Sequence, residues 1–134
     1  MSAITREAAC SCGKLSVVTS GEPVRVSICH CIACQRRTGS VFGVQARFPK
    51  AGVVVSGESH HYARVAESGH TLTFSFCPNC GSTVYYVNDG LPGFVGIPVG
   101  AFADPSFKQP EFSVYERSMH TWVVPPPGAD RDQA

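Results

Sequence analysis

The sequence has 134 residues, enough for one domain with a modest hydrophobic core. Hydrophobic residues make up 43% and charged residues 16% of the chain, which excludes the composition typical of disordered proteins. The net charge of +1 gives no electrostatic basis for binding nucleic acid or an anionic membrane, so we expect neither as a partner.

The beginning of the sequence shows no sign of a targeting segment. Residues 1–7 lack the apolar core of a secretory signal peptide. No apolar run approaches the roughly 18 residues of a membrane-spanning helix. We therefore expect a cytoplasmic protein, and disulfides are rare in that compartment.

Short strands separated by turns are predicted along most of the chain. Alternating or β-branched runs predict strands at 14–19, 24–28, 41–48, 53–55, 59–65, 70–76, 83–87, 94–99 and 112–116. Between the second and third of these, one or two turns of helix are expected from Ile32 to Arg37, and Gly39 could end them in a left-handed conformation. Gly43 indicates a bulge or a close approach in the next strand. The predicted fold class is therefore mainly β, a small single zinc-binding domain of short antiparallel strands.

The predicted domain covers residues 1–124. After it, Pro125-Pro126-Pro127-Gly128 and the polar residues that follow predict a tail at 125–134. We expect this tail to be extended or disordered and to lie outside the core.

The seven cysteines carry the strongest functional signal in the sequence. They fall into three groups, at positions 10 and 12, at 29, 31 and 34, and at 77 and 80. An odd number and such short spacings fit metal binding better than a disulfide framework. Zinc favours tetrahedral cysteine sites, and a site with only three protein ligands keeps one position for water or substrate. We therefore expect Zn²⁺ as the cofactor.

Two divisions of these cysteines are compatible with their spacing. The segment 77–81 has the Cys-x-x-Cys-Gly pattern of a zinc knuckle, in which both sulfurs reach one metal. It could share its metal with Cys31 and Cys34, as in a zinc ribbon, which leaves three cysteines unused. Alternatively it could share the metal with Cys10 and Cys12, which face the same way if they lie in a strand. This second division gives two zinc ions per chain and is more economical, but spacing alone hardly favours it.

Several segments of the chain match one known family in the same order. They are Cys10-x-Cys12-Gly13, Cys29-His30-Cys31-x-x-Cys34-x-Arg36-x-Thr38-Gly39-Ser40, Phe76-Cys77-x-x-Cys80-Gly81-Ser82, Gly100-x-Phe102-x-Asp104-Pro105, Tyr115-Glu116 and Trp122. Together they resemble the glutathione-dependent formaldehyde-activating (GFA-like) enzyme family, over nearly the whole predicted domain. The resemblance implies a β-rich, two-zinc fold of the β-tent type.

The resemblance also implies ligand sets and a reaction. It assigns a structural zinc to Cys10, Cys12, Cys77 and Cys80, and a catalytic zinc to Cys29, Cys31 and Cys34. The implied activity is that of a carbon–sulfur lyase on adducts between a thiol, such as glutathione, and a small aldehyde, such as formaldehyde. A metal-bound thiol is deprotonated, and the thiolate is the form that adds to a carbonyl carbon.

Three further residues near the open site are candidates for binding or proton transfer. Arg36 and Arg37 follow the cysteines, and at least one could hold a substrate carboxylate; solvated surface arginines are an equal alternative. His30 lies between two predicted ligands and is the nearest candidate proton donor, although such a histidine often points away from the metal.

The cysteine pattern is also compatible with two functions other than catalysis. Both zinc ions could be structural, in a non-catalytic module that binds a partner protein, since a fold alone does not fix a function. An exposed three-thiol site could also serve as a zinc or redox sensor.

Overall fold

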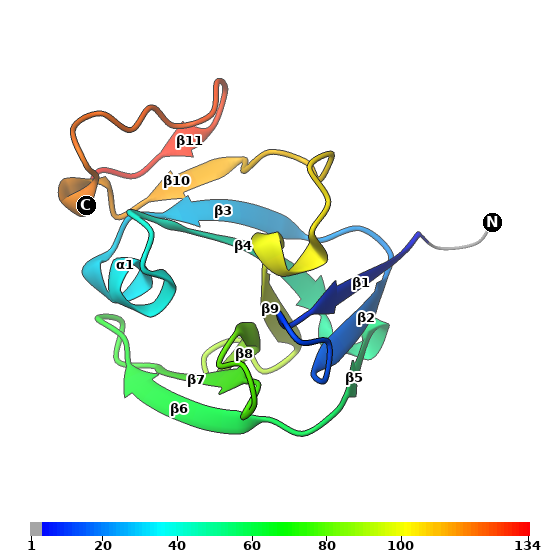
Figure 1. Cartoon of the computed structure of the whole chain (residues 1–134). Coiled ribbons are helices and arrows are strands. Elements are labelled where there is room, and N and C mark those ends of the chain that lie inside the picture. Colours follow the sequence, from blue (N-terminus) through cyan, green and yellow to red (C-terminus); the bar gives the residue numbers. More distant parts are fainter. Residues whose placement is uncertain (1–3) are drawn as a thin grey trace.

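The computed structural model describes residues 4–134, and its strands form two sheets (Figure 1). The smaller sheet has the order β1-β2-β5, with β1 (Thr5–Ala9), β2 (Ser16–Ser20) and β5 (Val53–Ser56). The larger sheet has the order β11-β10-β3-β4-β9-β8-β7-β6, with β3 (Arg25–Cys29), β4 (Gly43–Pro49), β6 (His60–Val65), β7 (Thr71–Phe76), β8 (Thr83–Asn88), β9 (Phe94–Pro98), β10 (Phe112–Val114) and β11 (Asp130–Arg131). The predicted mainly β fold class is confirmed. Residues 1–3 of the predicted domain lie outside the described residues.

Helical structure is limited to short elements. They are α1 (Ile32–Thr38) and the 3₁₀ turns η1 (Lys50–Gly52), η2 (Val99–Phe102) and η3 (Glu116–Ser118). The predicted helix is confirmed, and Gly39 ends it with φ of 72°, a conformation that glycine adopts without strain. None of the helices in residues 4–134 has the length and hydrophobicity that crossing a membrane requires.

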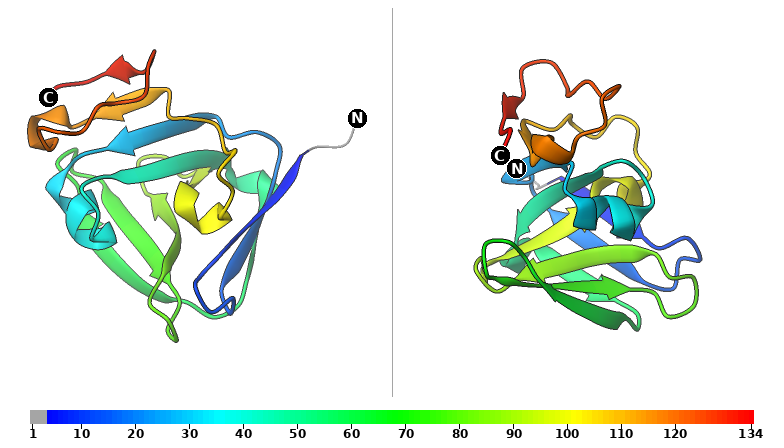
Figure 2. Two further views of the ribbon diagram at one scale, coloured as in Figure 1. Left: turned by 45° about the horizontal axis from the view of Figure 1, so that its top comes forward. Right: turned by 90° about the vertical axis from the view of Figure 1, so that its left-hand side faces the viewer.

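The large sheet is mixed and strongly curved. Most of its neighbouring strands are antiparallel, but β10 pairs in parallel with both β3 and β11. Figures 1 and 2 show β10 and β11 at one end of the sheet and β6 and β7 at the other, with α1 beside the space between the two ends. The curvature therefore brings distant strands around one concave face.

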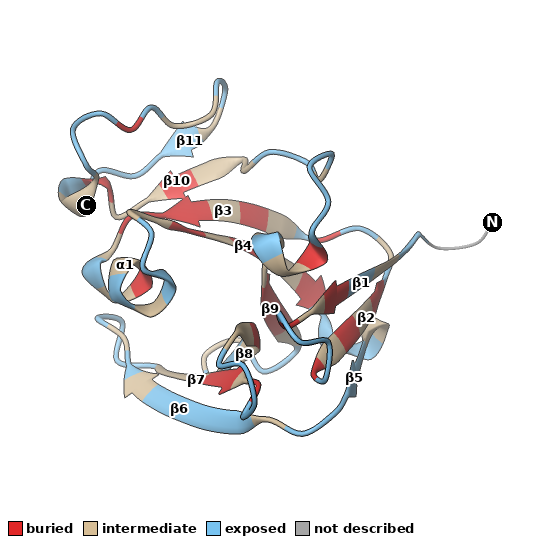
Figure 3. Ribbon diagram, in the orientation of Figure 1, coloured by how far each residue is buried: buried red, intermediate tan, exposed pale blue. Residues whose placement is uncertain are grey.

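The core lies where the small sheet packs against the convex side of the large sheet (Figure 3). Ala8 and Val17 from the small sheet meet residues such as Val26, Ala46 and Ile97 from the large sheet, and all five are fully buried. Side chains alternate between the two faces of a strand. Neighbours of these core residues consequently point toward the concave face.

The structure contains one strand near the N-terminus that the sequence pattern did not predict. β1 has the sequence TREAA, in which only Thr5 is of the β-branched or aromatic type typical of strands. It is held by antiparallel pairing with β2 from Thr5↔Ser20 to Ala9↔Ser16, and Ala8 is fully buried. Long-range pairing rather than local preference therefore forms this strand.

The C-terminal tail at 125–134, expected to be extended or disordered and outside the core, has no buried residue but is attached to the large sheet. Asp130 and Arg131 form β11, which pairs with Phe112 and Ser113 of β10. The Arg131 guanidinium also forms a 2.9 Å ion pair with the buried carboxylate of Glu116. These contacts attach the end of the chain to the large sheet, although the boundary at residue 124 stays a prediction.

Candidate metal centres and the adjoining cavity

The structure brings four cysteines from two distant segments together. This four-cysteine cluster comprises Cys10, Cys12, Cys77 and Cys80. Its sulfurs all lie within 4.8 Å of one another, with Cys12 Sγ 3.7 Å from Cys10 Sγ and 3.6 Å from Cys77 Sγ. Tetrahedral zinc with Zn–S bonds of about 2.3 Å separates its sulfur ligands by about 3.8 Å. The donor set and its spacing therefore fit one zinc ion.

Backbone N–H groups point at the sulfurs of the four-cysteine cluster. Leu15 N–H donates to Cys10 Sγ over 3.2 Å, and Asn79 N–H donates to Cys77 Sγ over 3.4 Å. Gly81 has φ of 81° and closes the knuckle through a 2.8 Å hydrogen bond from its N–H to the Cys77 carbonyl. Such donors offset the negative charge of thiolates, so both segments are prepared for metal binding.

The remaining three cysteines form a separate group. This three-cysteine cluster comprises Cys29 at the end of β3, Cys31 at the N-cap of α1 and Cys34 within α1, with sulfurs within 4.8 Å of one another. Cys34 N–H donates to Cys31 Sγ over 3.3 Å, and the Gln45 amide donates to Cys34 Sγ over 3.7 Å. The structure therefore groups the sulfurs as four plus three and excludes the arrangement in which Cys31 and Cys34 share a metal with the knuckle.

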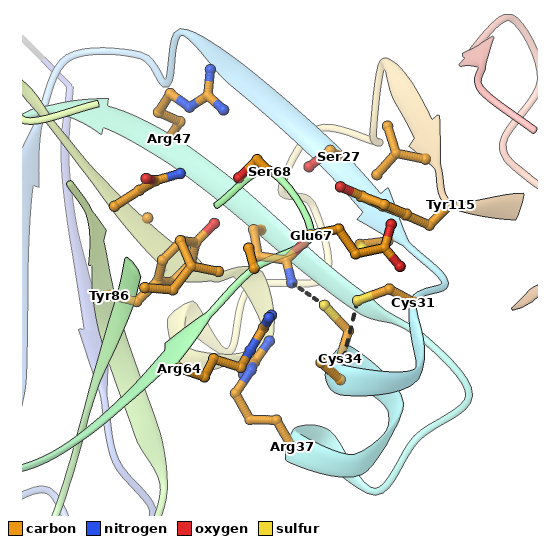
Figure 4. A pocket seen from close by; sticks show the side chains of 18 of the residues that line it. Ser27, Cys31, Cys34, Arg37, Arg47, Arg64, Glu67, Ser68, Tyr86 and Tyr115 are labelled. Carbon is orange, nitrogen blue, oxygen red and sulfur yellow. Dashed lines mark hydrogen bonds between the residues drawn. The ribbon is translucent and has the colours of Figure 1, made fainter. Parts of the chain in front are cut away.

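A cavity of about 520 Å³ opens from the three-cysteine cluster along the concave face of the large sheet (Figure 4). All three cysteines of that cluster line it. Five arginines and two acids also contribute to its lining: Arg25, Arg37, Arg47, Arg64, Arg117, Glu67 and Asp132. The volume is that of a small-molecule site, and the excess of arginine favours an anionic occupant.

Arg37 and Arg64 lie near the sulfurs of the three-cysteine cluster (Figure 4). Both guanidinium groups sit over the Phe74 ring, at 5.0 Å and 5.5 Å from its centre. The buried Nε of Arg37 has no hydrogen-bond partner among the described residues. Arg36, the other sequence candidate, is exposed on α1 and does not line the cavity.

Gly43 leaves the space that the Gln45 and Arg37 side chains occupy beside the three-cysteine cluster. A Cβ at this position would lie 2.7 Å from Gln45 Nε2 and 3.2 Å from an Arg37 guanidinium nitrogen. The pairing of β3 with β4 continues through Cys29↔Gly43. Of the two predicted roles for Gly43, the structure therefore shows the close approach.

Comparison with known proteins places this arrangement in a family. The sequence profile of the glutathione-dependent formaldehyde-activating enzyme family matches residues 5–118. The chain belongs to this family. No curated protein matches the sequence significantly. A crystal structure of a Rhodobacter sphaeroides protein superposes with a TM-score of 0.57 at 17% identity, covering 95% of this chain and 99% of that one. This likeness shows a shared fold only.

In this member of the formaldehyde-activating enzyme family, the histidine between the cysteines does not face the cavity. His30 is fully buried, and its Nε2 lies 3.0 Å from Ser113 Oγ. Ser113 in turn donates to Glu116 over 2.6 Å. Burial lowers the pKa of His30 and favours its neutral form. Because the ring does not line the cavity, its position does not support the predicted proton-donor role.

Two tyrosines that the sequence did not single out for chemistry line the cavity of this formaldehyde-activating family member. Burial raises the pKa of Tyr86 to about 12 and also raises the pKa of Tyr115, so both hydroxyls stay protonated at neutral pH. Tyr115 has φ of 58°, a left-handed conformation that is unusual for a bulky residue. Tyr86 lies against Gly96 of β9, where a Cβ would overlap its ring. Gly96, a glycine within the strand predicted at 94–99, is therefore the clue to Tyr86 that the sequence contains.

Proposed function

We propose that the protein is a zinc-dependent carbon–sulfur lyase acting on adducts of a thiol, such as glutathione, and a small aldehyde, such as formaldehyde. The observation that carries this proposal is the position of the three-cysteine cluster at one end of an arginine-lined cavity. Family membership supports the same reaction class.

The two cysteine clusters have different roles in this proposal. The four-cysteine cluster would hold a structural zinc, which ties the segment after β1 to the turn between β7 and β8. The three-cysteine cluster would hold the second zinc and leave one of four tetrahedral positions toward the cavity. A zinc ion bound there would keep a coordinating substrate thiol deprotonated at neutral pH.

Residues around the cavity would orient the substrate and stabilise the charge that develops in the reaction. In the synthetic direction, the sulfur adds to the carbonyl carbon, and the carbonyl oxygen gains an electron pair and then the proton that the thiol has lost. Arg37 and Arg64 would attract the developing oxyanion, and the Tyr86 and Tyr115 hydroxyls would donate hydrogen bonds to it. Breaking of the carbon–sulfur bond follows the same path in reverse.

The Gln45 amide has a supporting role at the ligand Cys34. It donates over 3.7 Å to the sulfur and is itself buried. A buried donor of this kind fixes the direction of the sulfur and lowers its charge density. The side chain therefore holds the three-cysteine cluster in one geometry beside the cavity.

Two cysteine variants test the proposed division of labour. We expect Cys29→Ser to stay folded with about one zinc per chain and to lose activity by at least about 100-fold. Cys77→Ser should unfold the domain, because the binding energy of a structural zinc is also folding energy. Elemental analysis and circular dichroism measure zinc content and folding. NMR exchange spectroscopy of a glutathione–formaldehyde mixture measures turnover.

The outcome separates catalysis from the two other functions. A Cys29→Ser protein that unfolds like Cys77→Ser would contradict the proposal and support a module in which both zinc ions are structural. A wild-type protein that holds two zinc ions but does not accelerate the exchange would also contradict it. Reversible release of one zinc on mild oxidation, without turnover, would instead support a sensor.

A further inference from the structure

Two arginines lie side by side in the cavity at a distance from the three-cysteine cluster. Arg25 of β3 and Arg47 of β4 are directly opposed in the register of the two strands, and both line the cavity. Figure 4 shows Arg47 at the end opposite Cys31 and Cys34. This far arginine pair, Arg25 and Arg47, is separate from Arg37 and Arg64 near the sulfurs.

Fold stability does not explain the far arginine pair. Like charges at directly opposed positions of neighbouring strands destabilise a sheet. Burial and the charge of Arg47 both lower the pKa of Arg25, which shows the cost of holding the two charges together. Within the described residues, no carboxylate lies within ion-pair distance of either guanidinium.

The carboxylate that acts on Arg25, that of Glu111, is already engaged elsewhere. Glu111 attracts Arg25 electrostatically, but its carboxylate accepts a 3.1 Å hydrogen bond from Val26 N–H and a 3.4 Å contact from Lys108. The Arg25 guanidinium instead lies 4.0 Å over the Phe112 ring. Stacking on an aromatic face orients the planar group and leaves its N–H edge for an anion.

The strand itself sets the distance between the two ends of the cavity. Cys29, Ser27 and Arg25 are alternate residues of β3 and all line the cavity. The backbone of β3 spans about 13 Å from Arg25 to Cys29. The distance between the guanidinium group and the sulfur is shorter where the two side chains lean toward each other. An extended tripeptide spans about 10 Å. In a tripeptide with a central cysteine, such as glutathione, a terminal carboxylate lies about 7 Å along the extended chain from the thiol-bearing residue, and the long side chains of Arg25 and Arg47 reach toward it. In a single amino acid the thiol and the carboxylate belong to one residue, so the carboxylate would stay near the cysteines.

We propose that Arg25 and Arg47 form a carboxylate subsite that selects peptide-sized thiols over small ones. The inference rests on the proposed function only in placing the sulfur at the three-cysteine cluster. A guanidinium group offers two parallel N–H donors to one carboxylate, and such bidentate contacts combine charge with geometry. Binding an anion here also relieves the repulsion between the two arginines.

Binding of S-methylglutathione to the zinc-loaded protein tests the subsite without any reaction, because this probe has no free thiol. We expect Arg25→Leu and Arg47→Leu each to weaken its affinity by about 10-fold or more in calorimetry, the effect of losing a charged hydrogen bond. Arg36→Leu, which removes an exposed arginine outside the cavity, is the matched control and should bind like wild type. The dimethyl ester of the probe should bind weakly and be insensitive to Arg25→Leu.

A stability measurement separates a binding role from a structural one. Because the far arginine pair is repulsive, Arg47→Leu should not lower the melting temperature, and Arg25→Leu should lower it only by as much as the loss of its contact with Phe112 outweighs the relief of repulsion. The proposal would be overturned if wild type and both leucine variants bound S-methylglutathione with equal affinity. It would also be overturned if none of the three proteins bound it. The protein could also bind S-methylglutathione in this arginine-dependent way without accelerating the glutathione–formaldehyde exchange. That result would contradict the proposed reaction but support the carboxylate subsite.

Discussion

Gly96 is the residue on which the position of Tyr86 depends. The two residues face each other across β8 and β9, and a Cβ on Gly96 would overlap the ring. We expect Gly96→Ala to displace the tyrosine, to lower stability by about 1–3 kcal/mol through overpacking and to reduce turnover. Chemical denaturation and the NMR exchange assay measure the two effects.

A matched glycine and a second variant make this prediction specific. Gly93 precedes the same strand and has open space where a Cβ would lie, so Gly93→Ala should be nearly neutral. In a Tyr86→Ala background, Gly96→Ala should cost much less, because the overlapping ring is gone. Equal effects of the two glycine variants would show that the ring does not need Gly96.

Individual residues of the site differ in how far the sequence could predict them. The cysteines and the left-handed Gly39 follow from spacing and local backbone chemistry. The sequence offered Arg36 and Arg37 equally, because both follow Cys34, and only Arg37 lines the cavity. Tyr86 and Arg64 carry no local signal, because they reach the cysteines only through strand pairing.

An ion pair between the half-exposed Arg131 and the buried carboxylate of Glu116 links the C-terminal strand β11 to η3 and β10. Glu116 accepts two 3.0 Å contacts from Arg131 Nε and a hydrogen bond from Ser113. The hydrogen bond from Arg131 is the main reason that the pKa of Glu116 is lowered from its ordinary value of 4.5. A carboxylate with a lowered pKa stabilises the fold above its ordinary pKa, and this contribution is lost as the pH falls through the folded-state pKa.

Glu116→Gln tests that linkage. At pH 7 we expect a loss of about 2 kcal/mol in the free energy of unfolding, as for other hydrogen bonds to charged groups. The difference from wild type should shrink as the pH falls below about 4.5, because wild type then loses the same charge. Urea denaturation of both proteins across this range measures it. A constant difference down to pH 4 would contradict the linkage.

Glu22→Gln, which breaks an exposed pair with Arg6, should cost under about 1 kcal/mol in the free energy of unfolding.

The elements that the sequence failed to predict are those made by partners far along the chain. β1 has a single strand-forming residue, Thr5, and depends on β2. β11 has only two residues and depends on β10. By contrast, β3 and β7 have clear local patterns and were predicted within about two residues. The sequence patterns predicted no strand after the proline-rich segment. The contacts that hold Asp130 and Arg131, including the ion pair of Arg131, are made with residues far along the chain and leave no local pattern.

The cavity is a property of the whole molecule. Its wall takes residues from β3, β4, β9, β8, β7 and β6 of the large sheet (Figure 4). The curvature of that sheet, visible in Figure 2, brings these strands around one space. The fold class and the cysteine groups could be predicted because they depend on local pattern. The cavity and its far arginine pair could not, because they depend on strand order and curvature.

The central claim is that seven sulfurs hold two zinc ions, one closed and one with a position open to the cavity. Zinc X-ray absorption spectroscopy of the wild-type protein tests it most directly. We predict an average of about 3.5 sulfur ligands per zinc, rising to about 4 when glutathione is added. Four sulfur ligands per zinc before addition, or no change after it, would contradict the account.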